Sequence, residues 1–134
     1  MSFLRRAFLL IFSPHIRYVK LHRKYEKRKS IFTRARLYRL SKRYGLEIAT
    51  SASIGEGLYL GHPYNITVAG GVTMGKNCNL HKGCTIGREN RGKRVGVPTL
   101  GDCVYVGINS IVVGNPGIIH AKENATENYI IHRV

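Results

Sequence analysis

Residues 58–87 read LYLGHPYNITVAGGVTMGKNCNLHKGCTIG, and this stretch decides the fold. A long apolar side chain recurs in it every six residues, from Val68 through Met74 and Leu80 to Ile86. Six is not the period of an α-helix, and an ordinary strand repeats every two residues. A fixed six-residue repeat predicts a β-solenoid, in which each hexad forms one short strand and a turn.

The six-residue spacing continues on both sides of this stretch. Its apolar positions are Ile48, Ile54, Leu60, Val68, Met74, Leu80, Ile86, Leu100, Val106 and Val112. Small residues stand two places before many of them, at Ala52, Val72, Cys78, Cys84, Val104 and Ser110. We expect the apolar set to stack and to fill the axis of the solenoid. A sandwich of short strands is the alternative, but sandwich strands do not keep this register.

The repeat is interrupted twice. Leu60 and Val68 are eight residues apart, and the two extra residues fall in the segment that contains His62. Residues 88–98 carry no hexad signal and hold four bases against one acid. Functional sites often lie where a regular pattern is broken, and a loop of this length in a compact domain is either functional or disordered.

The segment 58–87 resembles the hexapeptide-repeat acyltransferases, over about residues 38–115. The most similar branch comprises the serine O-acetyltransferases and the related capsule or exopolysaccharide O-acetyltransferases. The resemblance implies a left-handed parallel β-helix that forms a homotrimer, binds acetyl-CoA between subunits and acetylates a hydroxyl. The spacing alone predicts only the solenoid.

The resemblance also implies roles for individual residues. His62 occupies the position of the family's general base, which takes the hydroxyl proton as the oxygen attacks the thioester. Glu47, fifteen residues earlier, stands where the family has the carboxylate that orients this histidine. A structural His62 and a merely solvated Glu47 are the alternatives. We further expect substrate contacts from Tyr64, Asn65 and His81, and acetyl-CoA contacts from Gly87, Arg88, Lys93 and Arg94.

The departures from the serine enzymes bear on the acceptor. Those enzymes carry Asp where this chain has Gly61, and Arg-His-Pro where it has Gly96-Val97-Pro98. The side chains that would bind the ammonium and carboxylate groups of a free amino acid are therefore missing. We accordingly predict a glycan or glycan-precursor hydroxyl as acceptor, as in polysaccharide biosynthesis. Serine O-acetyltransferase is the alternative. Because about one and a half coils of the family pattern are not found, a shortened non-catalytic trimeric scaffold is another.

Most of the positive charge lies in the first third of the chain. The net charge is +15, and residues 1–45 hold fourteen Lys or Arg and one acid. An amphipathic helix is predicted before Pro14, and a second helix between Ser30 as N-cap and Gly45 as stop. We therefore divide the chain into a basic helical leader (1–45), a β-helix acyltransferase domain (46–119) and a C-terminal tail (120–134).

Three roles are open for the leader. It could lie on an anionic membrane, bind nucleic acid, or cap the open end of the solenoid. No nucleic-acid motif is found, so we expect no nucleic-acid partner. The apolar run of residues 7–12 is too short to span a bilayer. We predict a cytoplasmic protein with peripheral contact at the inner face of the plasma membrane.

The cysteines and the other histidines predict no further site. Cys78 and Cys84 are one hexad apart, which suits small packed side chains, and Cys103 stands alone. No metal-ligand spacing is present, and an odd cysteine count fits a reducing compartment. We expect the histidines outside the repeat to be solvated or lightly packed. These are His15, His22, His120 and His132.

Overall fold

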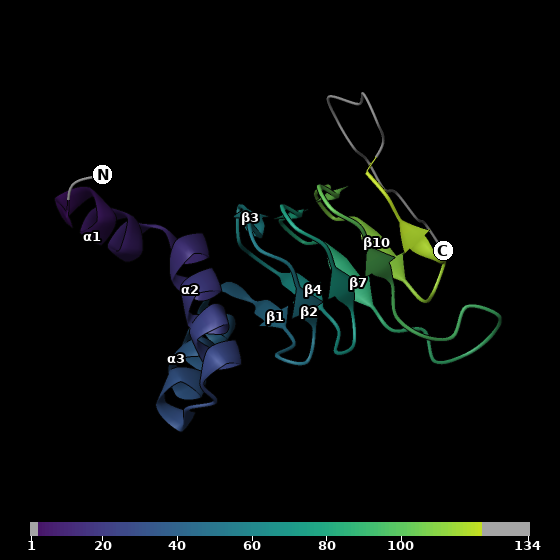
Figure 1. The fold of residues 1–134 in the computed structure, drawn as a ribbon, viewed down its shortest axis with the longest axis horizontal. Helices are drawn as coiled ribbons and strands as arrows, with labels where there is room; N and C mark the ends of the chain where they lie inside the picture. The colour runs from purple at the N-terminus through teal and green to yellow at the C-terminus, as the bar shows by residue number, and fades with distance from the viewer. Residues whose placement is uncertain (1–2, 122–134) are drawn as a thin grey trace.

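The computed structural model describes residues 3–121, in which three helices precede a stack of short parallel strands (Figure 1). The helices are α1 (Phe3–Phe12), α2 (Pro14–Lys27) and α3 (Ile31–Tyr44). Each helix within residues 3–121 is too short or too polar to traverse a bilayer.

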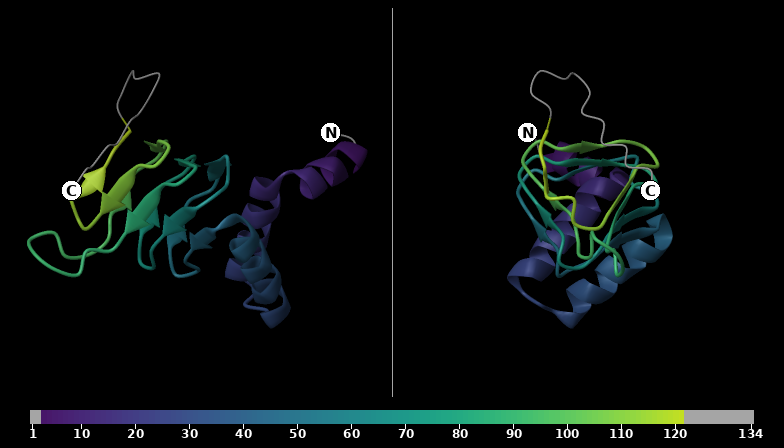
Figure 2. Two further views of the ribbon diagram at one scale, coloured as in Figure 1. Left: turned by 180° about the vertical axis from the view of Figure 1, so that it is seen from behind. Right: turned by 90° about the vertical axis from the view of Figure 1, so that its right-hand side faces the viewer.

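The strands form three parallel sheets. Sheet A has the order β1 (Leu46–Ile48), β4 (Ile66–Val68), β7 (Thr85–Gly87) and β10 (Ile111–Val113). Sheet B has the order β2 (Ser53–Ile54), β5 (Thr73–Met74), β8 (Thr99–Leu100) and β11 (Ile118–Ile119). Sheet C has the order β3 (Tyr59–Gly61), β6 (Asn79–His81) and β9 (Tyr105–Val106). The chain thus adds one strand to each sheet in turn, and one such circuit is called a coil here. Viewed along the stack, the coils have a roughly triangular outline (Figure 2).

The strand register accounts for both interruptions of the hexads. Thr67 pairs with Thr85, eighteen residues on, which is three hexads. Leu46 pairs with Ile66, twenty residues on, because two extra residues lie at the corner between β3 and β4. Thr73 pairs with Thr99, twenty-six residues on, because the loop 88–98 lies between β7 and β8. Each interruption therefore bulges from one corner and leaves the sheets in register.

The interior of the coils consists of the repeat positions predicted from the sequence. All ten apolar positions are buried, and so are the six small positions two places before them. Side chains alternate between the interior and the outside along the strands, so that in β1, for example, Leu46 and Ile48 are buried and Glu47 is exposed. The prediction that the apolar set fills the axis is confirmed.

A column of left-handed residues runs along the corner between sheets C and A. It contains Gly45, Asn65, Gly83 and Asn109, with φ values of 65°, 53°, 73° and 56°. Glycine and asparagine are the residues that adopt this conformation most readily. Asn65 and Asn109 place their Oδ1 atoms where a Cβ on Gly45 and Gly83, one coil earlier, would lie. The alternation of the two residue types therefore has a steric cause.

Two of the three observed helices, α1 and α3, were predicted from the sequence, and α2 was not. α1 ends before Pro14, and α3 runs from the N-cap Ser30 to the C-cap Gly45, as expected. α2 was not predicted, because its charged sequence shows no clear apolar stripe. Tertiary burial stabilises it, since Tyr18 and His22 on α2 are buried.

The helices α2 and α3 cover the first coil. Tyr18, Leu37 and Leu40 belong to the same buried cluster as Leu46 in β1. The Arg23 guanidinium donates hydrogen bonds to the carbonyl oxygens of Ile54, at 2.6 Å, and of Gly55. The capping role considered for the leader is therefore observed for α2 and α3, which close one end of the stack (Figure 1).

Two histidines of α2 lie at its contact with the first coil. His22 is buried, and burial lowers its pKa. His15 is half-buried, and its Nδ1 accepts a hydrogen bond from the backbone N–H of Leu60 at 3.1 Å. The expectation of solvated or lightly packed rings is wrong for His22, which is buried where α2 meets the first coil, whereas the half-buried His15 agrees with light packing.

Candidate active site

His62 lies at the corner where the first coil is longer than the hexad pattern allows. It follows β3, has a left-handed φ of 49°, and exposes its side chain. Within residues 3–121 no hydrogen bond to the His62 ring is recorded. Its imidazole is therefore available to a bound substrate, as a general base requires.

Aromatic and imidazole rings from successive coils form a row next to His62. The ring centroids of His62 and His81 are 6.5 Å apart, and those of His81 and Tyr105 are 4.7 Å apart. Burial lowers the pKa of His81, and the nearby His62 lowers it further. Both effects favour the neutral form of the His81 ring. Sequence reasoning missed Tyr105, although the register that pairs Leu80 with Val106 places it beside β6.

The ring of His81 lies directly over Gly61. A Cβ on Gly61 would lie 2.5 Å from Cε1 and 2.7 Å from Nε2 of His81. Real Cβ contacts do not approach this closely, so any side chain at position 61 would displace the ring. The two residues are thus matched: the absence of a side chain before His62 is what gives His81 its position.

Tyr64 and Asn65 lie at the same corner as His62. The Tyr64 ring meets the Tyr44 ring edge-on, with centroids 5.5 Å apart. The backbone N–H of Asn65 donates a hydrogen bond to the carbonyl of Tyr44 at 2.9 Å. Both residues therefore fix the corner against the end of α3, and their contact with substrate stays a prediction.

Glu47 is not brought into contact with His62 in the single chain. It lines a hollow of about 260 Å³ that also contains Tyr18, Ser41 and Leu46. Burial raises the pKa of Tyr18, and the Glu47 carboxylate contributes to this rise. Among residues 3–121 no ion pair between Glu47 and His62 is recorded. The orienting role of Glu47 stays a prediction.

The residues predicted to bind the acyl donor lie at a different corner. Gly87 ends β7, and the loop 88–98 follows at the corner between sheets A and B (Figure 1). Arg88 donates a 3.4 Å hydrogen bond to the carbonyl of Gly70. Lys93 and Arg94 are exposed, and the Arg94 carbonyl accepts a hydrogen bond from Asn115 at 2.9 Å. The single chain therefore does not gather His62 and these residues into one cleft.

Sequence comparison finds similarity to serine acetyltransferases. The chain is 32% identical over 97 residues to serine acetyltransferase of Staphylococcus aureus, which covers 70% of this chain and 44% of that protein. It is 30% identical over 95 residues to serine acetyltransferase of Staphylococcus epidermidis, with the same coverage. The chain thus spans under half the length of the curated relatives that it matches. No protein-family model matches it.

Structure comparison finds the same fold. Serine acetyltransferase of Neisseria gonorrhoeae in complex with serine superposes with a TM-score of 0.67 at 24% identity, covering 81% of this chain and 46% of that chain. The soybean apoenzyme superposes with a TM-score of 0.68 at 21% identity, covering 86% and 48%. In sequence and in fold, the resemblance of this chain to the hexapeptide-repeat acyltransferases of the serine acetyltransferase branch is confirmed.

Proposed function

We propose that this protein is an acetyl-CoA-dependent O-acetyltransferase with His62 as general base. The observation that carries the proposal is the exposed His62 imidazole at an interrupted corner of a chain that resembles serine acetyltransferases. The fold that we infer from this resemblance is a left-handed parallel β-helix.

The proposed reaction is acyl transfer from a thioester to an alcohol. The acceptor oxygen attacks the thioester carbonyl carbon while the unprotonated ring nitrogen of His62 takes the hydroxyl proton. The tetrahedral intermediate then collapses, the carbon–sulfur bond breaks, and the proton held by His62 passes to the departing thiolate. The products are an O-acetyl ester and the free thiol of coenzyme A. Acetyl-CoA is a substrate here, and it would be bound by Gly87, Arg88, Lys93 and Arg94.

We propose a homotrimer, which the positions of the two groups of residues support. His62 lies at the corner between sheets C and A, whereas the loop 88–98 lies at the corner between sheets A and B. Three copies related by a threefold axis along the coils could place the first corner of one copy beside the second corner of the next. A cleft shared in this way would complete a site that one chain lacks.

The comparisons favour serine as acceptor over the glycan expected from the sequence, since the relatives named are serine acetyltransferases. One observation keeps a glycan hydroxyl as the second candidate. The His81 ring occupies the space of any side chain at Gly61, where the serine enzymes carry Asp. This site therefore offers an uncharged imidazole in place of a carboxylate, which suits an acceptor without an ammonium group.

The proposal is tested by measuring thiol release from acetyl-CoA with serine and with a panel of sugars. Release with serine supports the first acceptor, and release with a sugar alone supports the second. A non-catalytic scaffold would show neither. Because a ligand that binds only the folded state raises its apparent stability, acetyl-CoA should also raise the melting temperature. No release and no thermal shift would contradict the proposal.

The location of the protein is part of the same proposal. Cys78, Cys84 and Cys103 are free thiols, which fits a reducing compartment such as the cytoplasm. A position at the inner face of the plasma membrane would follow only if the basic helices bind anionic lipid.

A further inference from the structure

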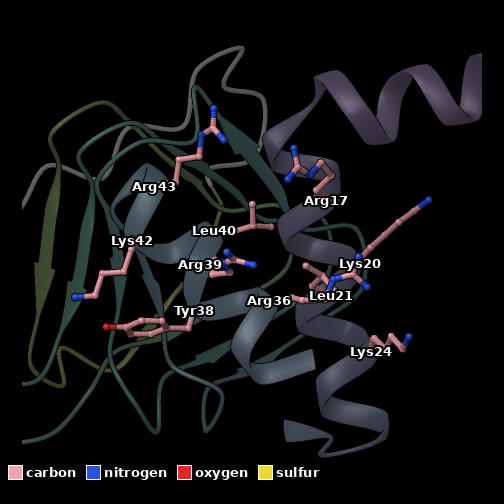
Figure 3. Close-up of a pocket in the computed structure, with 10 residues that line it drawn as sticks. All are labelled: Arg17, Lys20, Leu21, Lys24, Arg36, Tyr38, Arg39, Leu40, Lys42 and Arg43. Atoms are coloured by element: carbon pink, nitrogen blue, oxygen red, sulfur yellow. The ribbon is translucent and has the colours of Figure 1, made fainter. Parts of the chain in front are cut away.

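A basic groove lies between α2 and α3, on the helical end of the molecule (Figure 3). Its volume is about 980 Å³, and seven of its ten lining residues are Lys or Arg, with no acid among them. α2 contributes Arg17, Lys20 and Lys24 to the groove, and α3 contributes Arg36, Arg39 and Arg43. Leu21 and Leu40 lie between the two helices.

The charges of the groove are not neutralised within the described part of the chain. The ion pairs recorded among residues 3–121 both involve Glu26, and neither includes a groove residue. Several like charges around one hollow repel one another, and an anionic ligand would relieve this repulsion. The groove therefore has the electrostatics of a binding site for an anionic surface or polyanion.

α1 adds an apolar surface next to this groove. Leu4, Phe8 and Ile11 are spaced so that they share one face of the helix, and they are 79%, 59% and 62% exposed. Phe12 is also exposed, and its ring packs on that of Phe8 with centroids 4.5 Å apart. A short helix with such a face would be expected to bury it in a partner or in the boundary region of a membrane.

One contact joins the two surfaces. Arg17, which lines the groove, donates a 3.4 Å hydrogen bond from Nη1 to the backbone carbonyl of Ile11 at the end of α1. The apolar helix and the basic groove are therefore adjacent parts of one helical segment.

We propose that α1 and the α2–α3 groove form a docking surface for an anionic lipid bilayer. The exposed apolar side chains of α1 enter the boundary between head groups and acyl chains, and the groove receives lipid phosphates. Basic residues near an anionic membrane and an apolar helix face are the two components of such binding, and this segment has both.

Two other occupants fit the observations less well. A nucleic acid would match the basic groove but would leave the apolar face of α1 without a partner. A second copy of the chain would bring two groups of unneutralised basic residues together, which like-charge repulsion opposes. An anionic bilayer accounts for the charge and the apolar face at once.

The first experiment tests the groove with the full chain and flotation of vesicles. Phosphatidylcholine vesicles with 30% phosphatidylglycerol are compared with pure phosphatidylcholine, at low and high salt. The triple substitution Arg36→Gln, Arg39→Gln and Arg43→Gln should weaken binding to anionic vesicles about 100-fold, from roughly 1 kcal/mol for each basic residue near the surface. The matched control removes three charges from the coils, with Lys76→Gln, Lys82→Gln and Arg91→Gln, and should have little effect.

The second experiment tests α1. Phe8→Ser with Ile11→Ser should weaken vesicle binding about tenfold or more, whereas the exposed coil pair Val95→Ser with Ile108→Ser should not. Melting curves check that each variant folds. The proposal would be overturned if a test variant and its matched control lost vesicle affinity equally. Equal binding to neutral and anionic vesicles would overturn it as well.

Two further results would overturn it in favour of another occupant. One is tighter binding of a single-stranded oligonucleotide than of vesicles at matched phosphate concentration, unaffected by the α1 substitutions. The other is a change of oligomeric state on substitution of the groove without vesicles. Because every readout is binding or assembly, failure here would leave the acetyl-transfer proposal untouched.

Discussion

His15 on α2 accepts a hydrogen bond from the backbone N–H of Leu60 in the first coil, over 3.1 Å. Only an unprotonated Nδ1 can accept this bond. Burial lowers the pKa of His15, which agrees with a neutral ring in the folded state. The contact between the helical segment and the coils therefore includes a group that titrates.

This contact predicts a loss of stability in mild acid. Because the unfolded His15 takes up a proton at a higher pH than the folded one, its contribution is complete above about pH 6.5 and declines as the pH falls below that value. His22, whose pKa burial also lowers, acts in the same direction. The free energy of unfolding in urea should therefore fall between pH 7 and pH 5.

His15→Asn should reduce this pH dependence in part, because an amide oxygen can accept from Leu60 and does not titrate. The exposed His120→Asn serves as control and should leave the pH dependence unchanged. An unaltered slope for His15→Asn would contradict the role given to His15.

His62→Ala should lower the rate of acetyl transfer by about 10²–10⁴-fold, since removal of a general base has effects of this size. The side chain is exposed, so its loss should leave the melting temperature and the oligomeric state unchanged. Glu47→Gln should have a smaller effect on the rate. Steady-state thiol release with acetyl-CoA measures both, and a His62→Ala variant with full activity would exclude the assigned base.

Gly61→Ala should destabilise the protein by about 1–3 kcal/mol, because its methyl group would meet the ring of His81. His81→Ala in the same chain should restore most of this loss, since it removes the atoms that collide. A double-mutant cycle by urea unfolding gives the coupling between the two positions. Additive effects would show that the ring can move away without cost.

Arg23→Ala should cost about 1.5–3 kcal/mol of stability, because its guanidinium donates charged hydrogen bonds to the carbonyls of Ile54 and Gly55. The exposed Lys27→Ala on the same helix removes one positive charge without such contacts. Urea unfolding of both variants distinguishes the loss of the Arg23 hydrogen bonds from the effect of a lower net charge. Similar losses of unfolding free energy in the two variants would show that the Arg23 hydrogen bonds do not stabilise the contact between α2 and the coils.

The three thiols should differ in reactivity. Burial raises the pKa of Cys84 to about 12 and also raises that of Cys78, whereas Cys103 is exposed. Since the thiolate is the reactive species, iodoacetamide at pH 8 should modify Cys103 in the native protein and the other two only on unfolding. Mass spectrometry of the digested protein reports each site. Rapid native labelling of Cys84 would be inconsistent with its position inside the coils.

The interior of the coils could be predicted from the sequence because it depends on a local repeat. Each apolar position, from Ile48 to Val112, is buried by the same strand and turn, so spacing alone identifies it. The helix boundaries at Pro14 and Gly45 were equally local. α2 could not be found in this way, because burial of Tyr18 against the coils stabilises it and the sequence does not encode that contact.

In the candidate site, too, features that depend on local sequence could be predicted and features that depend on contacts between coils could not. His62 was found because it lies at an interruption of the repeat and at the position of the family's base, and His81 because it directly precedes the segment KGCTIG, residues 82–87. The tilted ring contact of His81 with Tyr105 and its fit over Gly61 depend on which coil lies above which, and hence on the lengths of the two interruptions. Glu47 was assigned from the resemblance alone, and the repeat gives no local signal for its distance from His62, because the first coil has twenty residues instead of eighteen.

In the corner column of Gly45, Asn65, Gly83 and Asn109, glycine and asparagine alternate from one coil to the next. Each asparagine fills the gap above a glycine, so neighbouring coils are unlike at this corner and alternate ones are equivalent. Duplication of a single coil would put two asparagines or two glycines in succession. Duplication of two coils would preserve the alternation, so at this corner the pair of coils is the repeating unit, whereas the column between sheets B and C, with Gly57, Asn77 and Cys103, does not alternate.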